Sequence, residues 1–360
     1  MLRQSNRDVI QTYRYLRGAM VALLLLLLLS VSYQAWWESE PSCWLGSISA
    51  YYYTPARTIF VGSLFGLGAA LIAYKGHTAE EDVLLNFSGF MALVVAMVPT
   101  VPDSSCETNG FSQTPAEIAM AVRNNIWSLI VATVIAVVVA ASIKAIMAIK
   151  KNGAAKKAAG LGIPDTALPA ARPGIPVVCI SVLCSLVLVL ELALFVALPD
   201  SFIALSHGIA AATMVIGVIM VMVLSALNVK DRLKGNDDRA KRVKRYQRIY
   251  IGLAAALGLL LGLTVVVSLA VSGFDHFILI SEVIIIVLFG AYWIVQTYEL
   301  RNLFEPATPD VPKSDVAKAE APEAKPPQEI AKAEAPEAKP PQEIAKAEAP
   351  EAMTENVVAQ

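Results

Sequence analysis

Four His, Lys or carboxyl side chains lie inside apolar segments of this 360-residue sequence, and one of them, Lys144, is close enough to the cytoplasmic end of its segment to reach water. Charged groups are costly within a membrane, so they mark candidate functional sites. His207 stands in SHGIAAATM and Glu282 in ILISEV, each a few residues into an apolar run that is expected to begin at the outer face of the membrane. At 1.5 Å per residue, both fall roughly 6–8 Å inside that face. Glu191 lies deeper along its own run, LVLELALF.

A histidine and a carboxylate at matched depth have two interpretations. They could line a pocket for a small molecule or a lipid head group, or form a proton-handling pair in which Glu282 tunes His207. Alternatively, they could only hydrogen-bond across helices and lock them together. Glu191 is either part of an ion or proton relay, or a protonated carboxyl that faces Ser or Thr on a neighbouring helix.

The stretch SISAYYYTPAR, residues 47–57, enters the next expected span from the same face. Tyrosines at a membrane interface are typical of an aromatic belt, which needs no ligand. The functional alternative makes the stretch the edge of a binding site, with Arg57 as the partner of an acidic group or an anionic ligand. Together with His207 and Glu282, the candidate ligand-binding residues are Ser47, Ser49, Tyr52, Thr54 and Arg57.

Composition identifies the class of protein. The chain is 56% hydrophobic and only 16% charged, which predicts an all-α polytopic membrane bundle rather than a soluble domain. Eight segments are long and apolar enough to cross a hydrocarbon core of about 30 Å. They are 18–37, 58–74, 83–100, 126–149, 177–198, 203–227, 249–272 and 277–298.

Lysine and arginine predict the orientation, because they concentrate in cytoplasmic loops. They are frequent in the N-terminal arm, 1–17, in the loop after 149 and in the basic loop at 230–248. Both termini are therefore expected in the cytoplasm, with the chain in the inner (plasma) membrane. The basic loop should contact anionic lipid head groups. A short loop held between spans is a poor nucleic-acid site, so no nucleic-acid partner is expected.

The transmembrane bundle is expected over 18–304, and a different composition follows it. The sequence AKAEAPEAKPPQEI occurs at 317–330 and again at 331–344. Alternating Lys and Glu with Ala and Pro provides no apolar face to bury, which predicts a disordered cytoplasmic tail over 305–360. The tail is a solvated spacer or a docking arm for a cytoplasmic partner.

Cysteine, histidine and glycine patterns give three further expectations. Cys43 and Cys106 fall in outer loops and could form a disulfide. The chain has three histidines, and His77 is on the cytoplasmic side, so a metal-dependent site lacks ligands; no cofactor or metal is expected. The pairs Gly62/Gly66 and Gly258/Gly262 predict close helix packing.

Four stretches resemble a group of uncharacterised bacterial six-span membrane proteins, loosely similar to the DRAM and FGF-receptor-activating-protein families. They are SISAYYYTPARTIFVGSLFGLGAALIAYKG, LLNFSGFMALVVAMVPT, SHGIAAATMV and ISEVIIIVLFGAYWIVQTYEL. The likeness covers roughly 45–100 and 203–300, and it implies a six-span core with the fourth and fifth spans inserted. The matching positions are Ser47, Ser49, Tyr51, Tyr52, Thr54, Arg57, Pro99, Thr100, His207, Glu282 and Trp293.

Three functional classes follow from these features. The favoured one is a membrane protein that binds or moves a lipid-like or small polar ligand at an outward-facing polar pocket. The second is a membrane scaffold that acts through the basic loop and the tail. The third, a membrane-embedded metal-dependent lipid hydrolase, is disfavoured by the shortage of histidines, so no enzymatic activity is assigned.

Overall fold

The chain is described by a computed structural model that covers residues 2–38, 44–100, 113–160, 175–232, 237–270 and 276–304. Every regular element within these ranges is helical, which confirms the expected all-α class. The tail at 305–360 and the two cysteines of the predicted disulfide, Cys43 and Cys106, lie outside the described residues. Their predicted properties stay predictions.

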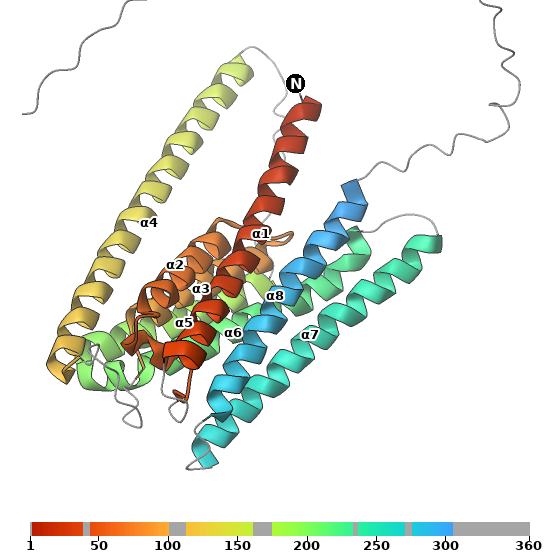
Figure 1. Cartoon of the computed structure of the whole chain (residues 1–360). Helices are drawn as coiled ribbons and strands as arrows, with labels where there is room; N and C mark the ends of the chain where they lie inside the picture. Colours follow the sequence, from red (N-terminus) through yellow and green to blue (C-terminus); the bar gives the residue numbers. More distant parts are fainter. Residues whose placement is uncertain are drawn as a thin grey trace, which may run out of the picture. The chain divides into compact units, whose positions relative to one another are not determined.

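The described residues form eight α-helices (Figure 1). They are α1 (Leu2–Tyr33), α2 (Arg57–Ala73), α3 (Ala79–Met97), α4 (Pro115–Gly160), α5 (Ile175–Ala197), α6 (Pro199–Arg232), α7 (Asp237–Ala270) and α8 (Phe277–Phe304). A short π-helix, η1 (Gln34–Glu38), continues α1, and a 3₁₀ helix, η2 (Ser49–Tyr53), precedes α2.

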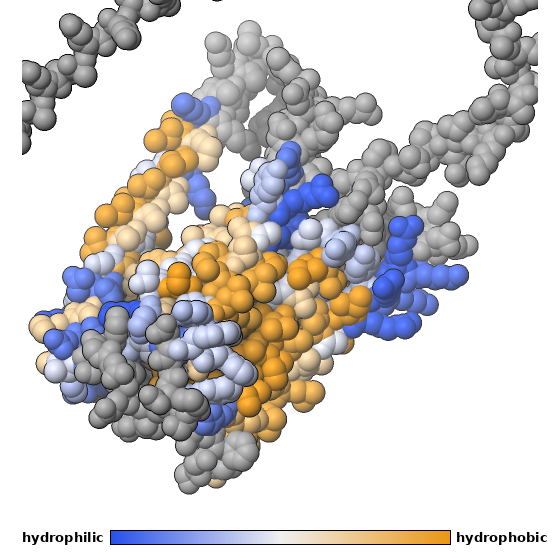
Figure 2. All heavy atoms as spheres, in the orientation of Figure 1, coloured by the Kyte–Doolittle hydropathy of each residue, from blue (hydrophilic) through white to orange (hydrophobic). Residues whose placement is uncertain are grey.

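Six of these helices, α1, α4, α5, α6, α7 and α8, are long and apolar enough to cross a membrane. The other two are shorter, since α2 has 17 residues and α3 has 19. Figure 2 shows hydrophobic side chains over the middle of the visible face and hydrophilic ones toward its ends, as a bilayer requires. The structure is therefore compatible with a multi-pass membrane protein.

Helix contacts close a ring of six members. In this ring α1 packs on α2, α2 on α3, α3 on α6, α6 on α7, α7 on α8, and α8 returns to α1. The remaining two helices attach from one side, because α5 contacts α3 and α6, whereas α4 contacts α3. The ring is the scaffold that positions the candidate site.

Two glycines bring the backbones of the ring helices α2 and α3 into close contact. A Cβ added at Gly68 on α2 would lie 2.7 Å from the carbonyl oxygen of Gly89 on α3, and one added at Gly89 would lie 2.6 Å from that of Gly68. The packing prediction for Gly258 and Gly262 was wrong, because a Cβ at either position meets no atom within 4 Å. The spacing of two glycines does not determine which face of a helix meets a neighbour.

The connection between α2 and α3 is held by a buried acid. Thr78 caps α3 by accepting a hydrogen bond from the Glu81 N–H (3.3 Å). The Glu81 carboxylate accepts hydrogen bonds from the His77 N–H (2.7 Å) and from the Asn228 side chain on α6 (3.3 Å). Burial alone would raise the pKa of Glu81, but these hydrogen bonds outweigh it and the pKa lies below its ordinary value.

Two segments predicted to lie outside the bundle are helical. The expected N-terminal arm, 1–17, belongs to α1 from Leu2 onward. The basic segment at 230–248 was predicted as a loop, yet α6 continues to Arg232 and α7 begins at Asp237. Lys and Arg have high helix propensity, so a helix can continue past the apolar run that spans the membrane.

Candidate functional site

The segment that precedes α2 is braced by its own hydroxyl groups. The Ser47 side chain accepts a hydrogen bond from the Ala50 N–H (3.1 Å) as η2 begins. The Thr54 hydroxyl donates to the Tyr51 carbonyl (2.7 Å) and accepts from the Ala56 N–H (3.2 Å), where η2 gives way to α2. Ser47 and Thr54 were predicted as ligand-binding residues, and the bonds that they make here stabilise the turn.

The same segment is attached to the first turns of α8. The Leu279 N–H donates to the Gly46 carbonyl (2.9 Å). The Ile48 N–H donates to the Glu282 carboxylate (2.5 Å), and the backbone N–H and hydroxyl of Ser49 also interact with this carboxylate. A partly buried acid is thus matched by donors from a chain segment more than 200 residues away, since 234 positions separate Ile48 from Glu282.

His207 on α6 contacts the other side of Ser49. Its Nε2 atom lies 2.8 Å from the Ser49 hydroxyl oxygen, and its Nδ1 atom lies 2.6 Å from the Val98 carbonyl oxygen. Because a carbonyl only accepts, Nδ1 carries a proton. Nε2 of the neutral ring is then an acceptor for the Ser49 hydroxyl. Both His207 and Ser49 are buried.

This arrangement permits two proton distributions. When the imidazole is neutral, the Ser49 hydroxyl donates to Nε2, and a protonated Glu282 can donate to Ser49. When the imidazole is charged, Nε2 donates to Ser49, and the Ser49 hydroxyl donates to an ionised Glu282. Ser49 therefore connects His207 to Glu282, and the cluster of Ser49, His207 and Glu282 is called the polar triad below.

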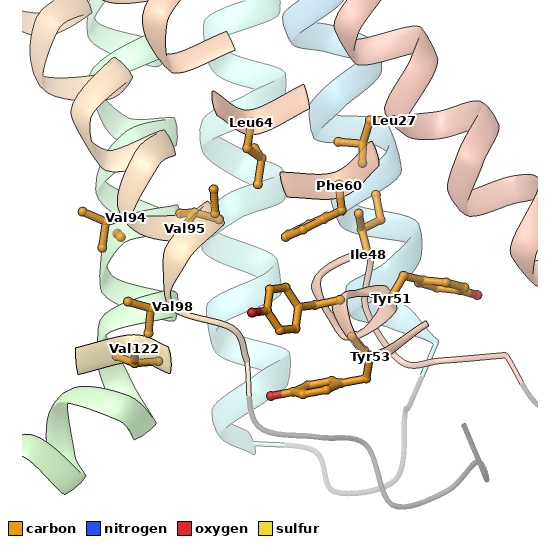
Figure 3. Packing of buried hydrophobic residues seen from close by; sticks show 14 of the residues in the cluster. Leu27, Ile48, Tyr51, Tyr53, Phe60, Leu64, Val94, Val95, Val98 and Val122 are labelled. Atoms are coloured by element: carbon orange, nitrogen blue, oxygen red, sulfur yellow. The ribbon is translucent and has the colours of Figure 1, made fainter. Parts of the chain in front are cut away.

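Tyr52, Tyr53 and Arg57 lie beside the polar triad and make contacts of their own. The Arg57 guanidinium donates to the Tyr52 hydroxyl (2.6 Å) and lies 4.2 Å from the centre of its ring. Arg57 was predicted to pair with an acidic group or an anionic ligand, and its partner in the structure is the Tyr52 hydroxyl. The Tyr53 hydroxyl donates to the Thr100 carbonyl (2.8 Å), and burial, then its neighbour Tyr52, raises the pKa of Tyr53 to about 12. Figure 3 shows Tyr51, Tyr53 and Phe60 as members of one buried cluster, in which the ring centres of Phe60 and Tyr52 are 6.5 Å apart.

A cavity of about 340 Å³ lies within the helix ring and ends at the polar triad. All six ring helices and the segment before α2 contribute to its walls, which are mainly Leu, Ile, Val, Ala and Phe side chains. Ser49 and Glu282 line it directly, whereas His207 stands behind Ser49. Along α6 the lining runs from Gly208 to Val218, which corresponds to roughly 15 Å at 1.5 Å per residue.

A second polar pair lies on the other side of α6. The Ser206 hydroxyl donates to one carboxyl oxygen of Glu191 on α5 (2.5 Å), which is the serine partner that the structural alternative for Glu191 required. Adjacent residues of α6, Ser206 and His207, therefore serve two separate clusters. One hundred degrees of rotation per residue is enough to direct them to different neighbours.

Two features of the helix ring were not predicted from the sequence. The Val98 carbonyl that orients His207 is a backbone group, so no side-chain pattern could indicate it. A buried network also links Arg17 on α1 to the Gln296 carbonyl on α8 (3.4 Å), and Gln296 to Tyr74 and Tyr292 (3.2 and 3.1 Å). Gln296 was a detectable signal, because an amide within an apolar span needs partners.

Comparison of the chain with protein-family models, with curated proteins and with solved structures found no match. Among the described residues, no group of three His, Cys, Asp or Glu side chains is arranged to hold a metal ion. The polar triad and the cavity that ends at it are therefore the features of the described residues that point to a function.

Proposed function

We propose that this chain is an inner-membrane protein that binds or moves a lipid-like ligand inside its helix ring. The observation that carries the proposal is the cavity of about 340 Å³ with apolar walls and with Ser49 and Glu282 at one end. Ligand sites commonly have such volumes, apolar linings and a few convergent polar groups. An acyl or prenyl chain would occupy the apolar length, and its head group would meet the polar triad.

The polar end favours a head group with hydroxyls. Glu282 and the Ser49 hydroxyl oxygen both present acceptors, because the Ser49 proton is used within the polar triad. Hydroxyl groups of a head group could donate to both. A strongly anionic group is less suited to the position beside an acid, and Arg57, which could have matched one, is bonded to Tyr52 and is not part of the cavity wall.

The proposed topology has eight spans with both termini in the cytoplasm. The shorter helices α2 and α3 are ring members with extensive neighbours, and a helix enclosed by others can be shorter than one in direct contact with lipid. The ring would be the six-span core of the resembled bacterial group, with α4 and α5 as the insertion. Their attachment to one side of the ring supports this interpretation.

The decisive experiment is native mass spectrometry of the protein purified in a mild detergent. The wild type should retain a lipid-like molecule. Gly208→Leu should lose it, because Gly208 lines the cavity and a Cβ there meets no atom within 4 Å, so the larger side chain fills the space without a backbone clash. Gly262→Leu is the matched control, because Gly262 is exposed and is no part of the cavity wall.

Two further variants test the polar end. Ser49→Ala and Glu282→Gln should each lower lipid occupancy about tenfold, which corresponds to one hydrogen bond of about 1.4 kcal/mol. If Gly208→Leu and Gly262→Leu retain the same lipid equally, the cavity is not the binding site and the proposal is wrong.

The geometry of Ser49 and His207 favours a second candidate, acyl transfer. Ser49 Oγ would attack an ester carbonyl, its proton would pass to His207 Nε2, and the leaving alkoxide would take that proton. A 2.8 Å contact with Nε2 and a fixed Nδ1–H support this. It ranks second because the Ile48 N–H, which could stabilise the oxyanion, already donates to Glu282.

A serine-directed fluorophosphonate probe distinguishes the two candidates. Labelling of Ser49 that disappears in both Ser49→Ala and His207→Ala would establish an activated nucleophile. Lipid retention without any labelling would leave binding or movement as the function. The scaffold alternative depends on the tail at 305–360, and deletion of that tail tests it separately.

A further inference from the structure

A second cavity, of about 520 Å³, lies between α3, α4, α5 and α6. None of its lining residues belongs to the first cavity, so the two are separate sites. Its walls are mainly apolar. One wall position, however, is a carboxyl group, that of Glu191.

Glu191 is only partly satisfied by the protein. Its side chain is 6% exposed, and one carboxyl oxygen accepts the hydrogen bond from Ser206. The other oxygen is buried and has no hydrogen-bond partner among the described residues. A buried carboxyl with an unmatched oxygen is unfavourable whether it is ionised or protonated, because each form needs a partner.

The wall of the second cavity also contains aromatic rings. Phe195 and Phe202, on either side of the turn between α5 and α6, have ring centres 5.2 Å apart, and Phe87 and Phe90 line the cavity from α3. Aromatic faces attract cations through their quadrupole. No Lys, Arg or His is among the lining residues, so nothing in the described wall supplies a positive charge to Glu191.

We propose that this second cavity binds a hydrophobic amine, with the ammonium group paired to Glu191 among the phenylalanine rings. An ammonium ion would donate to the unmatched oxygen and offset the cost of burying the carboxylate. Its apolar body would occupy the space between α3, α4 and α5. The proposal does not depend on the function assigned to the first cavity, because no wall residue is shared.

The experiment uses the full chain in lipid nanodiscs and a photoreactive long-chain primary amine, with the alcohol of equal length as the neutral counterpart. Peptide mapping after illumination should place the amine on α3 and α5 residues of the second cavity. Glu191→Gln, which keeps the shape and hydrogen-bonding capacity of the side chain, should lower that labelling at least about tenfold. Glu282→Gln is the matched control, because it alters a partly buried acid of the other cavity.

A second variant keeps the proposal testable if Glu191→Gln does not fold. Leu188→Trp narrows the cavity without removing the carboxyl, and it should also reduce labelling by the amine. If the alcohol labels the second cavity as strongly as the amine does, the proposal is wrong, because binding would then not depend on the positive charge of the ammonium group. Undiminished amine labelling in Glu191→Gln, or an equal loss in Glu282→Gln, would overturn it as well.

Discussion

Nε2 of His207 lies 2.8 Å from the hydroxyl oxygen of Ser49, although 158 positions separate the two residues in the sequence. Ser49 belongs to η2, before α2, and His207 lies near the start of α6. The contact therefore depends on the ring, in which α3 stands between α2 and α6. Val98, the residue that follows α3, presents its carbonyl to the same imidazole.

Removal of the Ser49 hydroxyl should destabilise the protein. In Ser49→Ala the buried Nε2 of His207 loses its partner, which costs about 1–3 kcal/mol. The midpoint of thermal denaturation in detergent measures this loss. Ser47→Ala is the comparison, because Ser47 is partly exposed. The Ala50 N–H, which donates to the Ser47 hydroxyl, also donates to the carbonyl of residue 47, so it keeps a partner in this variant. An equal decrease in both variants would mean that His207 gains nothing from Ser49.

Glu81 should make stability depend on pH. Its pKa is lower in the folded protein than its ordinary value of 4.5, so the folded state binds a proton less readily than the unfolded state does. The stabilisation is therefore complete above about pH 4.5 and is lost as the pH falls through the lower, folded-state pKa. The midpoint of thermal denaturation of the wild type should therefore decrease as the pH is lowered from 7 to 3.

The variant Glu81→Gln isolates this contribution. It should be less stable at pH 7, because the hydrogen bonds from His77 and Asn228 then end on an uncharged amide. It should also lose less stability than the wild type below pH 4.5. A pH dependence that is identical in the two proteins would assign the effect to other carboxyl groups.

The close contact between α2 and α3 should not accommodate any side chain at Gly68 or Gly89. A Cβ at Gly68 or Gly89 would lie within 2.7 Å of a backbone oxygen of the other helix, so Gly68→Ala and Gly89→Ala should each destabilise by about 1–3 kcal/mol. Gly258→Ala, where a Cβ meets open space, should leave the denaturation midpoint unchanged or higher. Comparable losses at all three positions would contradict the helix contact.

The first turns of α7 should recruit anionic lipids. Lys241 and Lys244 lie in this basic segment, and Lys241 is exposed. Each lysine near an anionic surface contributes about 1 kcal/mol. The double variant Lys241→Gln/Lys244→Gln should lower the relative association constant of spin-labelled phosphatidylglycerol, but not that of phosphatidylcholine, with a difference that shrinks at high salt. Equal changes for both lipids would indicate a loss of structure instead.

Hydropathy and charge alone predicted much of the architecture. Long apolar runs must be helical in lipid, because their backbone groups find no other partners. Both ends of α2 and α5 and the start of α8 lie close to those expected. His207 and Glu282 could be identified as candidates for the same reason, since an ionisable side chain in an apolar run needs a compensating contact. Depth along a helix follows from counting residues.

The tertiary structure decided which of these residues meet. Equal depth does not specify the rotation of a helix or its neighbours, so Ser47 and Thr54 brace a turn whereas Ser49 joins His207 to Glu282. Ser206 and His207 are adjacent in the sequence but contact different clusters. Of the four glycines that spacing had favoured, Gly66 makes a close contact, with Leu23 of α1, whereas a Cβ at Gly62, Gly258 or Gly262 meets no atom within 4 Å. Local sequence determines that a segment is a membrane helix, but only the packing of all the helices determines which face of each one is enclosed.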